Sequence, residues 1–256
     1  MARQSGFTLI EIITVLVILA IVASISTQFV VDSLDSYRTA QIRSRLLGKS
    51  RLALEQITRY ARGAVPNSVR VSASGNCVEL MPMAAGLYYQ GALADANNNA
   101  PISSSAEISQ ASFDLDAPRH LIVSPWFSGE IYSSAMPSAR ANYLGISGSL
   151  VSFSAHRFLR NSPHHRLYLG DDPVRFCLRN GNLQFHKGYS VSTVLGDADP
   201  GGNSALLATN VSSAAQAFAL SAGSENRNAS LDLNLRFSEG AIAVTLNQTI
   251  LVRNVP

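Results

Sequence analysis

Apolar and polar positions divide the first 31 residues into two unequal parts. Residues 1–6 are mostly polar, carry one charged side chain, Arg3, and end at Gly6. Residues 7–31 are predominantly apolar and contain a single carboxylate, Glu11. The 20 residues from 12 to 31 would form a helix about 30 Å long, enough to cross the hydrocarbon core of a bilayer. The pattern predicts a membrane-associated helix at the start of the chain.

Three ordinary interpretations of this segment can be considered. A cleavable signal peptide fits the basic start and the small residues Ser24 and Ser26, and an uncleaved anchor fits the length. A buried core helix fits the apolar run but gives no reason for the leader. None of the three explains Glu11, because a carboxylate near the start of a membrane helix costs roughly 2–3 kcal/mol. Glu11 therefore needs a specific role.

The helical pattern continues beyond the apolar run. Residues 7–64 contain no proline, and apolar side chains recur at spacings of three, four and seven until Pro66 stops the helix. We expect one helix with two parts, a membrane half (7–31) and an amphipathic half (32–64) that lies on a domain. The predicted buried stripe is Ile42, Leu46, Ala53, Ile57 and Tyr60, and the predicted solvated basic positions are Arg38, Arg43, Arg45, Lys49, Arg51, Arg59 and Arg62.

Residues 65–256 change to the short alternating runs that are typical of strands. The clearest feature is Asn180-Gly181 between two apolar runs, because both positions of a tight primed turn need positive φ. Residues 231–237 and 242–252 alternate cleanly and predict a terminal strand pair. Residues 94–112 lack periodicity and predict a surface loop. Further predicted strands are residues 69–71, 77–80, 87–89, 120–123, 150–153, 166–169, 174–178 and 183–186.

Composition restricts the class of protein further. The chain is 46% hydrophobic and only 14% charged, and its formal charge is +3. Such a small balance does not indicate a nucleic-acid partner. Two cysteines, Cys77 and Cys177, lie too far apart in sequence for metal-ligand spacing but suit one long-range disulfide in an oxidising compartment.

The segment Gly6-Phe-Thr-Leu-Ile-Glu11 resembles the prepilin signature of type IV pilins and of the pseudopilins of type II secretion. The resemblance implies cleavage after Gly6 by a prepilin peptidase on the cytoplasmic side and N-methylation of Phe7. It implies that Glu11 pairs with the N-terminal amine of a neighbouring subunit. It also implies a pilin-like α+β fold, with a long N-terminal helix, half of it transmembrane, packed on an antiparallel β-rich periplasmic head.

Later segments resemble the MshO-type minor pilins of the mannose-sensitive haemagglutinin (MSHA) pilus and, more loosely, the type J minor pseudopilins. The membrane helix lacks the kinking proline that major pilins often have. The resemblance implies a single-pass inner-membrane protein that joins a pilus, with prepilin peptidase, other pilins, an assembly platform and membrane lipid as partners. A secretion pseudopilin and a tip adhesin remain alternatives. The segments are residues 75–82, 176–178 and 207–212 with Phe218, and 252–256.

The sequence gives little support for a catalytic or a metal-binding function. We find no Gly-x-Ser-x-Gly, Walker or His-Glu-x-x-His motif, so we expect no enzyme and no cofactor. Asp197, Asp199 and Asn203 lie in a turn-rich loop and form a weak calcium candidate, because no bidentate glutamate follows at the proper offset. We expect the histidines to be surface or structural residues: His120, His156, His164, His165 and His186. Four aromatic residues suit a local core or contact with a surface: Trp126, Phe127, Tyr132 and Tyr143.

Overall fold

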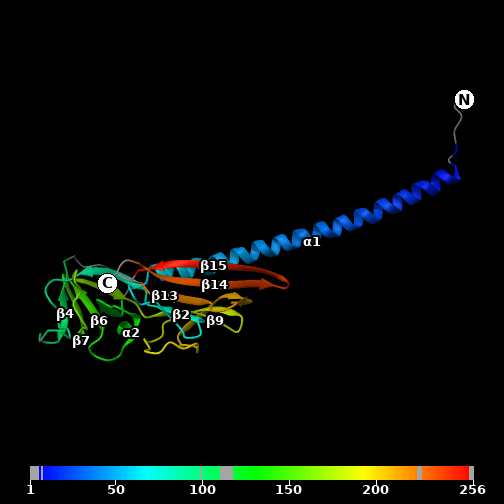
Figure 1. Cartoon of the computed structure of the whole chain (residues 1–256). Coiled ribbons are helices and arrows are strands. Elements are labelled where there is room, and N and C mark those ends of the chain that lie inside the picture. The colour runs from blue at the N-terminus through cyan, green and yellow to red at the C-terminus, as the bar shows by residue number, and fades with distance from the viewer. Residues whose placement is uncertain (1–5, 7, 99, 110–117, 224–226, 254–256) are drawn as a thin grey trace.

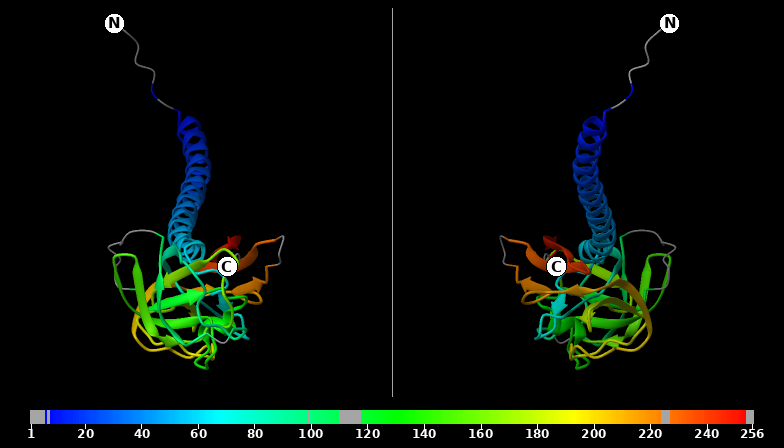
Figure 2. Two further views of the ribbon diagram at one scale, coloured as in Figure 1. Left: turned by 90° about the vertical axis from the view of Figure 1, so that its left-hand side faces the viewer. Right: turned by 90° about the vertical axis from the view of Figure 1, so that its right-hand side faces the viewer.

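The structure is a computed structural model that describes residues 6, 8–98, 100–109, 118–223 and 227–253. One helix, α1 (Leu9–Arg62), has 54 residues and is therefore about 81 Å long. The backbone N–H of Gly63 donates to the Arg59 carbonyl at 3.1 Å and closes its last turn. The helix projects far beyond a β-rich head, and its first half stands clear of it (Figures 1 and 2). The predicted long helix is confirmed over Leu9–Arg62, and it ends two residues before the predicted residue 64. The α+β, pilin-like architecture is also confirmed.

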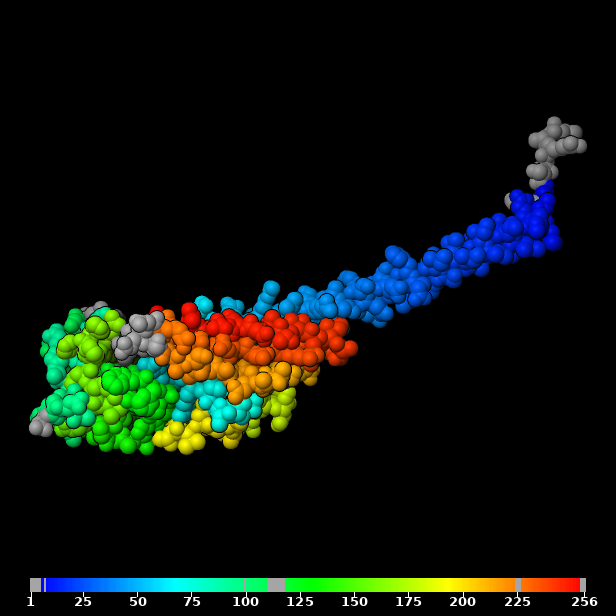
Figure 3. Space-filling model, viewed as in Figure 1, coloured from blue at the N-terminus to red at the C-terminus, as the bar shows by residue number. Residues whose placement is uncertain are grey.

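The second half of α1 packs on the head as the apolar stripe predicts. Its buried side chains lie against β14 and β15, which run beside the helix in Figure 3. Ile42 and Tyr60 are partly buried, and the predicted basic positions are all exposed. One of them, Arg45, pairs with Glu239 at the end of β14. The buried helix residues are Leu46, Ser50, Ala53, Leu54, Ile57 and Ala61.

Two antiparallel sheets and α1 enclose the first hydrophobic core. In one sheet, β14 pairs with β15 on one side and with β12 and β13 on the other. The alternating side chains from Leu231 to Phe237 are buried, which confirms the predicted terminal pair. The second sheet has the order β1-β2-β9-β10-β11. The strands are β12 (Val211–Ser212), β13 (Phe218–Ser221), β14 (Ala229–Glu239), β15 (Ile242–Val252), β1 (Arg70–Val71), β2 (Cys77–Leu80), β9 (Val174–Arg179), β10 (Asn182–Lys187) and β11 (Asn203–Thr209).

The hairpin between β9 and β10 has the predicted turn. Asn180 and Gly181 have φ values of 48° and 74°, so both central positions lie in the left-handed region. This turn fixes the register in which Leu183 faces Leu178 and Phe185 faces Phe176. Local turn chemistry is therefore sufficient to predict this part of the head.

A third sheet forms a separate lobe with its own core. Its order is β3-β8-β5-β6-β7-β4, and a bridge between Tyr89 and Ile108 joins the two outer strands, so the sheet closes on itself at one end. The lobe lies at the end of the molecule farthest from the start of α1 (Figure 1). Its elements are β3 (Met83–Tyr88), β4 (Ser103–Glu107), β5 (His120–Val123), β6 (Arg140–Ser147), β7 (Leu150–His156) and β8 (Arg166–Gly170), with the short helix α2 (Ser128–Tyr132) beside it.

The prediction of a surface loop over residues 94–112 is wrong for Ser103–Glu107, which form the strand β4. This strand pairs with β7, and Ala94, Ala106 and Ile108 of the predicted loop are buried. The strand Ser-Ser-Ser-Ala-Glu exposes three of its five side chains, so it lacks the apolar alternation that would reveal it. Pairing with β7 determines its conformation instead. Residues 99 and 110–112 of this prediction lie outside the described residues.

Candidate functional site

The first half of α1 exposes an apolar surface on every side. Among the described residues, α1 is the one helix long and apolar enough to cross a membrane, and its most apolar part has no buried residue. Leu9 is 79% exposed and Phe29 71% exposed. Water would solvate such a surface poorly, so it fits a lipid environment or contact with other apolar helices. The boundary at residue 31 between the two halves stays a prediction.

Glu11 lies in the first turn of this apolar helix. Its backbone N–H donates to the Thr8 carbonyl at 3.2 Å, and its own carbonyl accepts from the Thr14 hydroxyl at 2.9 Å. Within the described part of the chain, its exposed carboxylate has no hydrogen bond or ion pair. The carboxylate is thus available to an external cation. Gly6 is exposed, whereas Phe7 and the leader residues 1–5, with Arg3, lie outside the described residues.

Cys77 and Cys177 form a disulfide between the adjacent strands β2 and β9. Both residues are fully buried, and 100 positions separate them in sequence. In the chain-entropy model a loop of this length contributes about 4–5 kcal/mol. The bond therefore stabilises one sheet of the head.

The same sheet carries a buried ionic group that the sequence pattern does not predict. Glu79 is 0% exposed and accepts hydrogen bonds from Arg175 at 2.8 Å and from Tyr189 at 2.9 Å, and it forms an ion pair with Arg70. The two guanidinium groups also donate to backbone carbonyls of residues 192–198. Burial raises the pKa of the Tyr189 phenol, and the Glu79 carboxylate raises it further. This group anchors the loop before β11 to the sheet.

The three calcium candidates have separate contacts in the structure. Hydroxyl groups of Ser74 and Ser72 hold the pKa of Asp197 below its usual range. Asp199 accepts from the Gly201 N–H at 2.9 Å, and Asn203 is paired with Lys187 at the start of β11. Among the residues that the structure describes, no three His, Cys, Asp or Glu side chains are grouped to hold a metal ion.

Three histidines are buried in the head, which agrees with the structural role considered for them. His120 lies 3.2 Å from Asp172, His156 contacts Ser138, and His186 lies 3.5 Å from Asp199. Burial lowers the pKa of each of the three imidazoles. The adjacent His164 and His165 are exposed in a loop before β8.

The aromatic candidates of the head divide into buried and exposed side chains. Tyr132 is buried and Tyr143 partly buried, but Trp126 is 65% and Phe127 60% exposed. The Trp126 ring lies 3.9 Å from the guanidinium carbon of Arg160, which forms two hydrogen bonds of 2.7 Å with Glu130. Glu130 also accepts the Trp126 backbone N–H at 2.8 Å. The indole is thus held in place on the surface.

Comparison with known proteins gives one match, and it falls on the amino-terminal segment. Residues 1–27 match the family model described as the prokaryotic N-terminal methylation motif. The match indicates a type IV prepilin-like protein that is processed by prepilin peptidase and anchored in a membrane by its apolar helix. No curated protein and no solved structure matches the chain.

Proposed function

We propose that this chain is a minor pilin of an MSHA-type type IV pilus and takes part in initiating, capping or assembling the filament. The observation that carries the proposal is the apolar half of α1, which is exposed on every side and bears one carboxylate, Glu11, that has no partner among the described residues. The head does not cover this half of the helix, so it is suited to packing against the apolar helices of other subunits. The head would then lie outside the membrane, on the periplasmic side.

The chemistry of assembly follows from the position of Glu11. Cleavage after Gly6 frees the amine of Phe7, which becomes a methylated ammonium group at the end of the helix. A carboxylate in an apolar environment is costly by itself, but a facing ammonium offsets most of that cost. Glu11 of one subunit and the Phe7 amine of the next are therefore the groups that align neighbouring helices. No step of this assembly needs an active site in this chain, and we propose that it is not an enzyme.

A minor rather than a major role is supported by two features. The head carries a six-stranded lobe in addition to the two sheets that α1 supports. Residues 7–64 contain no proline, which departs from the kinked helix often found in major pilins. The expected partners are prepilin peptidase, other minor and major pilins, the inner-membrane assembly platform and membrane lipid.

A type J-like pseudopilin of type II secretion uses the same processing and the same helix contacts, so it remains the second candidate. A tip adhesin is the third, and the fixed, exposed Trp126 favours it. Deleting residues 94–145 would be one way to separate adhesion from assembly, because a pilus that assembles without this segment but no longer adheres would indicate an adhesin. The structure argues against this deletion because it would remove β4, β5 and most of β6 from the lobe. Point substitutions of exposed side chains are the better test.

The experiment that tests the proposal is the N-terminal mass of the protein from native membranes. We expect a chain that starts at methylated Phe7, and we expect Gly6→Asp to leave the leader attached. Ser5→Ala is the matched control and should be processed normally. A chain that starts near Thr27 would mean a secreted soluble domain and would overturn the proposal.

A further inference from the structure

The strand β15 forms an unpaired edge of the sheet that packs against α1. It has 11 residues, and it pairs with β14 along its whole length without a register shift. No other strand that the structure describes pairs with it. It contains no proline, glycine or charged residue. Figure 3 shows β15, in red, at the surface along the rim of the head. A long, regular and uncharged edge of this kind is suited to pairing with another chain.

The backbone groups at this edge can be assigned from the neighbouring strand. The N–H groups of Asn234 and Ser238 in β14 donate away from β15, to the carbonyls of Ala217 and Asn210. Alternate residues of a strand direct their backbone groups to opposite sides, so the odd-numbered residues of β14 bond to β15. Their partners in β15 are its even-numbered residues. The residues of β15 whose N–H and C=O groups point outward are therefore Ala243, Thr245, Asn247, Thr249 and Leu251.

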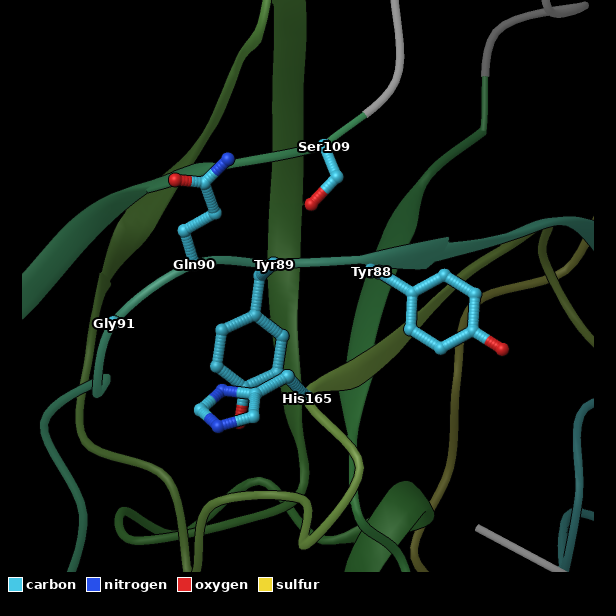
Figure 4. Close-up of a pocket in the computed structure, with 6 residues that line it drawn as sticks. All are labelled: Tyr88, Tyr89, Gln90, Gly91, Ser109 and His165. Carbon is cyan, nitrogen blue, oxygen red and sulfur yellow. The ribbon is translucent and has the colours of Figure 1, made fainter.

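The other sheet edges are protected in ways that β15 is not. β1, β12 and β13 have only two to four residues each, and a register shift interrupts the pairing of β11 with β10. In the third sheet, the Gln90 N–H donates to the Glu107 carbonyl at 2.7 Å, and the Ser109 N–H donates to the Tyr88 carbonyl at 3.0 Å. Figure 4 shows Ser109 on the segment next to that of Tyr88 and Gln90. Short, irregular or closed edges resist pairing with other chains.

The inward side chains of β15 leave the first core incomplete at this edge. Ile250 and Val252 are buried, but Ile242, Val244 and Leu246 are only partly buried although they pack against the core. A further strand beside β15 would cover this apolar row if its own inward side chains were apolar. A charged side chain at an inward position would lose its hydration there without gaining a partner. The edge therefore fits a strand with apolar inward and polar outward side chains.

The direction of α1 argues against β15 of a second copy as the partner. Arg45 in α1 pairs with Glu239 before β15, and Thr58 farther along α1 accepts a hydrogen bond from Gln248 at 3.4 Å. The strand β15 and the helix thus run in the same direction (Figure 1). Two copies paired antiparallel through β15 would point their apolar helix halves in opposite directions, so one membrane could not hold both. Parallel pairing would align the helices but is less stable per residue.

We propose that the outer edge of β15 accepts an antiparallel strand from the head of a different subunit. This inference rests on the proposed function, in which packing of the apolar helix halves brings the heads of neighbouring subunits together. The outward backbone groups bind any extended segment, and the incomplete core selects a segment whose side chains alternate between apolar and polar. The pairing would extend the four-stranded sheet by one strand across the boundary between two subunits.

Hydrogen exchange with single-residue resolution tests the pairing. The full chain alone in lipid nanodiscs is compared with the assembly purified from native cells through a tag on this chain. In the isolated chain, we expect the outward amides of Thr245, Asn247 and Thr249 to exchange about tenfold faster than those of their inward neighbours, because they have no backbone partner. In the assembly, their exchange should slow by about tenfold.

Three results of this experiment would overturn the proposal. Outward amides that are protected in the isolated chain at every concentration would mean that the edge is already covered. Outward amides that exchange equally fast in the assembly would mean that no strand is added. Protection that rises with the concentration of the isolated chain would mean that two copies pair with each other, which contradicts a different subunit as the partner.

Asn247→Pro separates pairing at the edge from folding of the head. Its N–H points outward, so proline removes no hydrogen bond to β14 and blocks the edge. We expect the head to melt at nearly the same temperature, and the amides of Thr245 and Thr249 to exchange in the assembly as fast as in the isolated chain. Asn247→Lys should have the same effect, because a lysine at an edge disfavours pairing.

Asn234→Lys is the matched control, because Asn234 lies directly opposite Asn247 on β14 and away from the edge. It should leave the protection of the outward amides normal. Normal protection in both Asn247 variants would also overturn the proposal. Processing at Gly6 is measured on the same preparations. An unprocessed chain would contradict the proposed function, whereas a processed chain that enters filaments with a free edge would contradict this inference alone.

Discussion

The two halves of α1 differ in where their apolar side chains lie. In the second half, Ile57 and Ala61 are fully buried against the head, whereas Ile18 in the first half is 60% exposed. The same continuous helix therefore has one half that its own chain stabilises and one half that only lipid or other helices can cover. The difference shows that stability of the head and assembly of the helix are properties of separate residues, which substitutions can address one at a time.

The largest expected effect on stability is that of a substitution in the second half of α1, and a matched substitution in the first half is its control. Ile57→Ala should destabilise the head by about 4 kcal/mol, because it removes a fully buried side chain and leaves a cavity. Ile18→Ala should leave the head unchanged. Denaturant unfolding of the full chain in detergent, followed by circular dichroism, measures both. Equal effects of the two substitutions would contradict the separation of the halves.

A second prediction concerns the buried pair beneath Trp126. Glu130→Gln should destabilise the lobe by about 3 kcal/mol, since it leaves the Arg160 charge poorly compensated in a largely buried position. Arg160→Lys keeps the charge but loses the two parallel hydrogen bonds and should have a smaller effect. Trp126 is the chain's one tryptophan, so its fluorescence reports the loss of order directly. An unchanged anisotropy in Glu130→Gln would contradict the role of this pair in holding the indole.

The pH dependence of the head follows from its buried histidines. Burial lowers the pKa of His120, His156 and His186 in the folded state, so folding favours their neutral forms. Their contribution is complete above the unfolded pKa of about 6.5 and is lost as the pH falls below it. We expect the melting temperature to fall between pH 7 and pH 5, and His186→Gln to reduce that fall. A melting temperature that is flat over this range would exclude the effect.

The smallest expected effect is at the junction of α1 and β14. Arg45 and Glu239 form an ion pair at the surface, with half of the arginine side chain exposed. Solvent and salt screen such pairs, so Arg45→Ala should cost about 0.5 kcal/mol or less. The same unfolding experiment, repeated in high salt, checks that the difference disappears. A loss comparable to that of Ile57→Ala would mean that charge, rather than apolar packing, holds the helix on the head.

The sequence predicts the parts of the fold that local chemistry determines. The long helix follows from the absence of proline and from the apolar stripe. The hairpin follows from Asn180-Gly181, and the terminal pair follows from alternation. Each of these signals lies within a few residues of the feature that it specifies.

The remaining features depend on contacts between distant segments. The strand Ser103–Glu107 is polar and is specified by pairing with β7, so no local pattern reveals it. In the sequence, nothing distinguishes Glu79 from an ordinary strand residue. In the fold, arginines from two strands form ion pairs with it. The position of Trp126 on the surface also depends on such contacts, because Arg160 lies against its ring and pairs with Glu130. The candidate site at residues 6–11 can be identified from the sequence because its motif is one contiguous segment.

The most direct test of the central claim is the amount of this protein in sheared filaments when Glu11 is replaced. We expect Glu11→Gln to be processed and held in the membrane at normal levels but to be lost from the filaments, because it lacks the carboxylate that we propose faces the neighbouring amine. Glu55→Gln changes an exposed glutamate in the second half of the same helix and should enter filaments normally. Normal incorporation of Glu11→Gln would contradict the account.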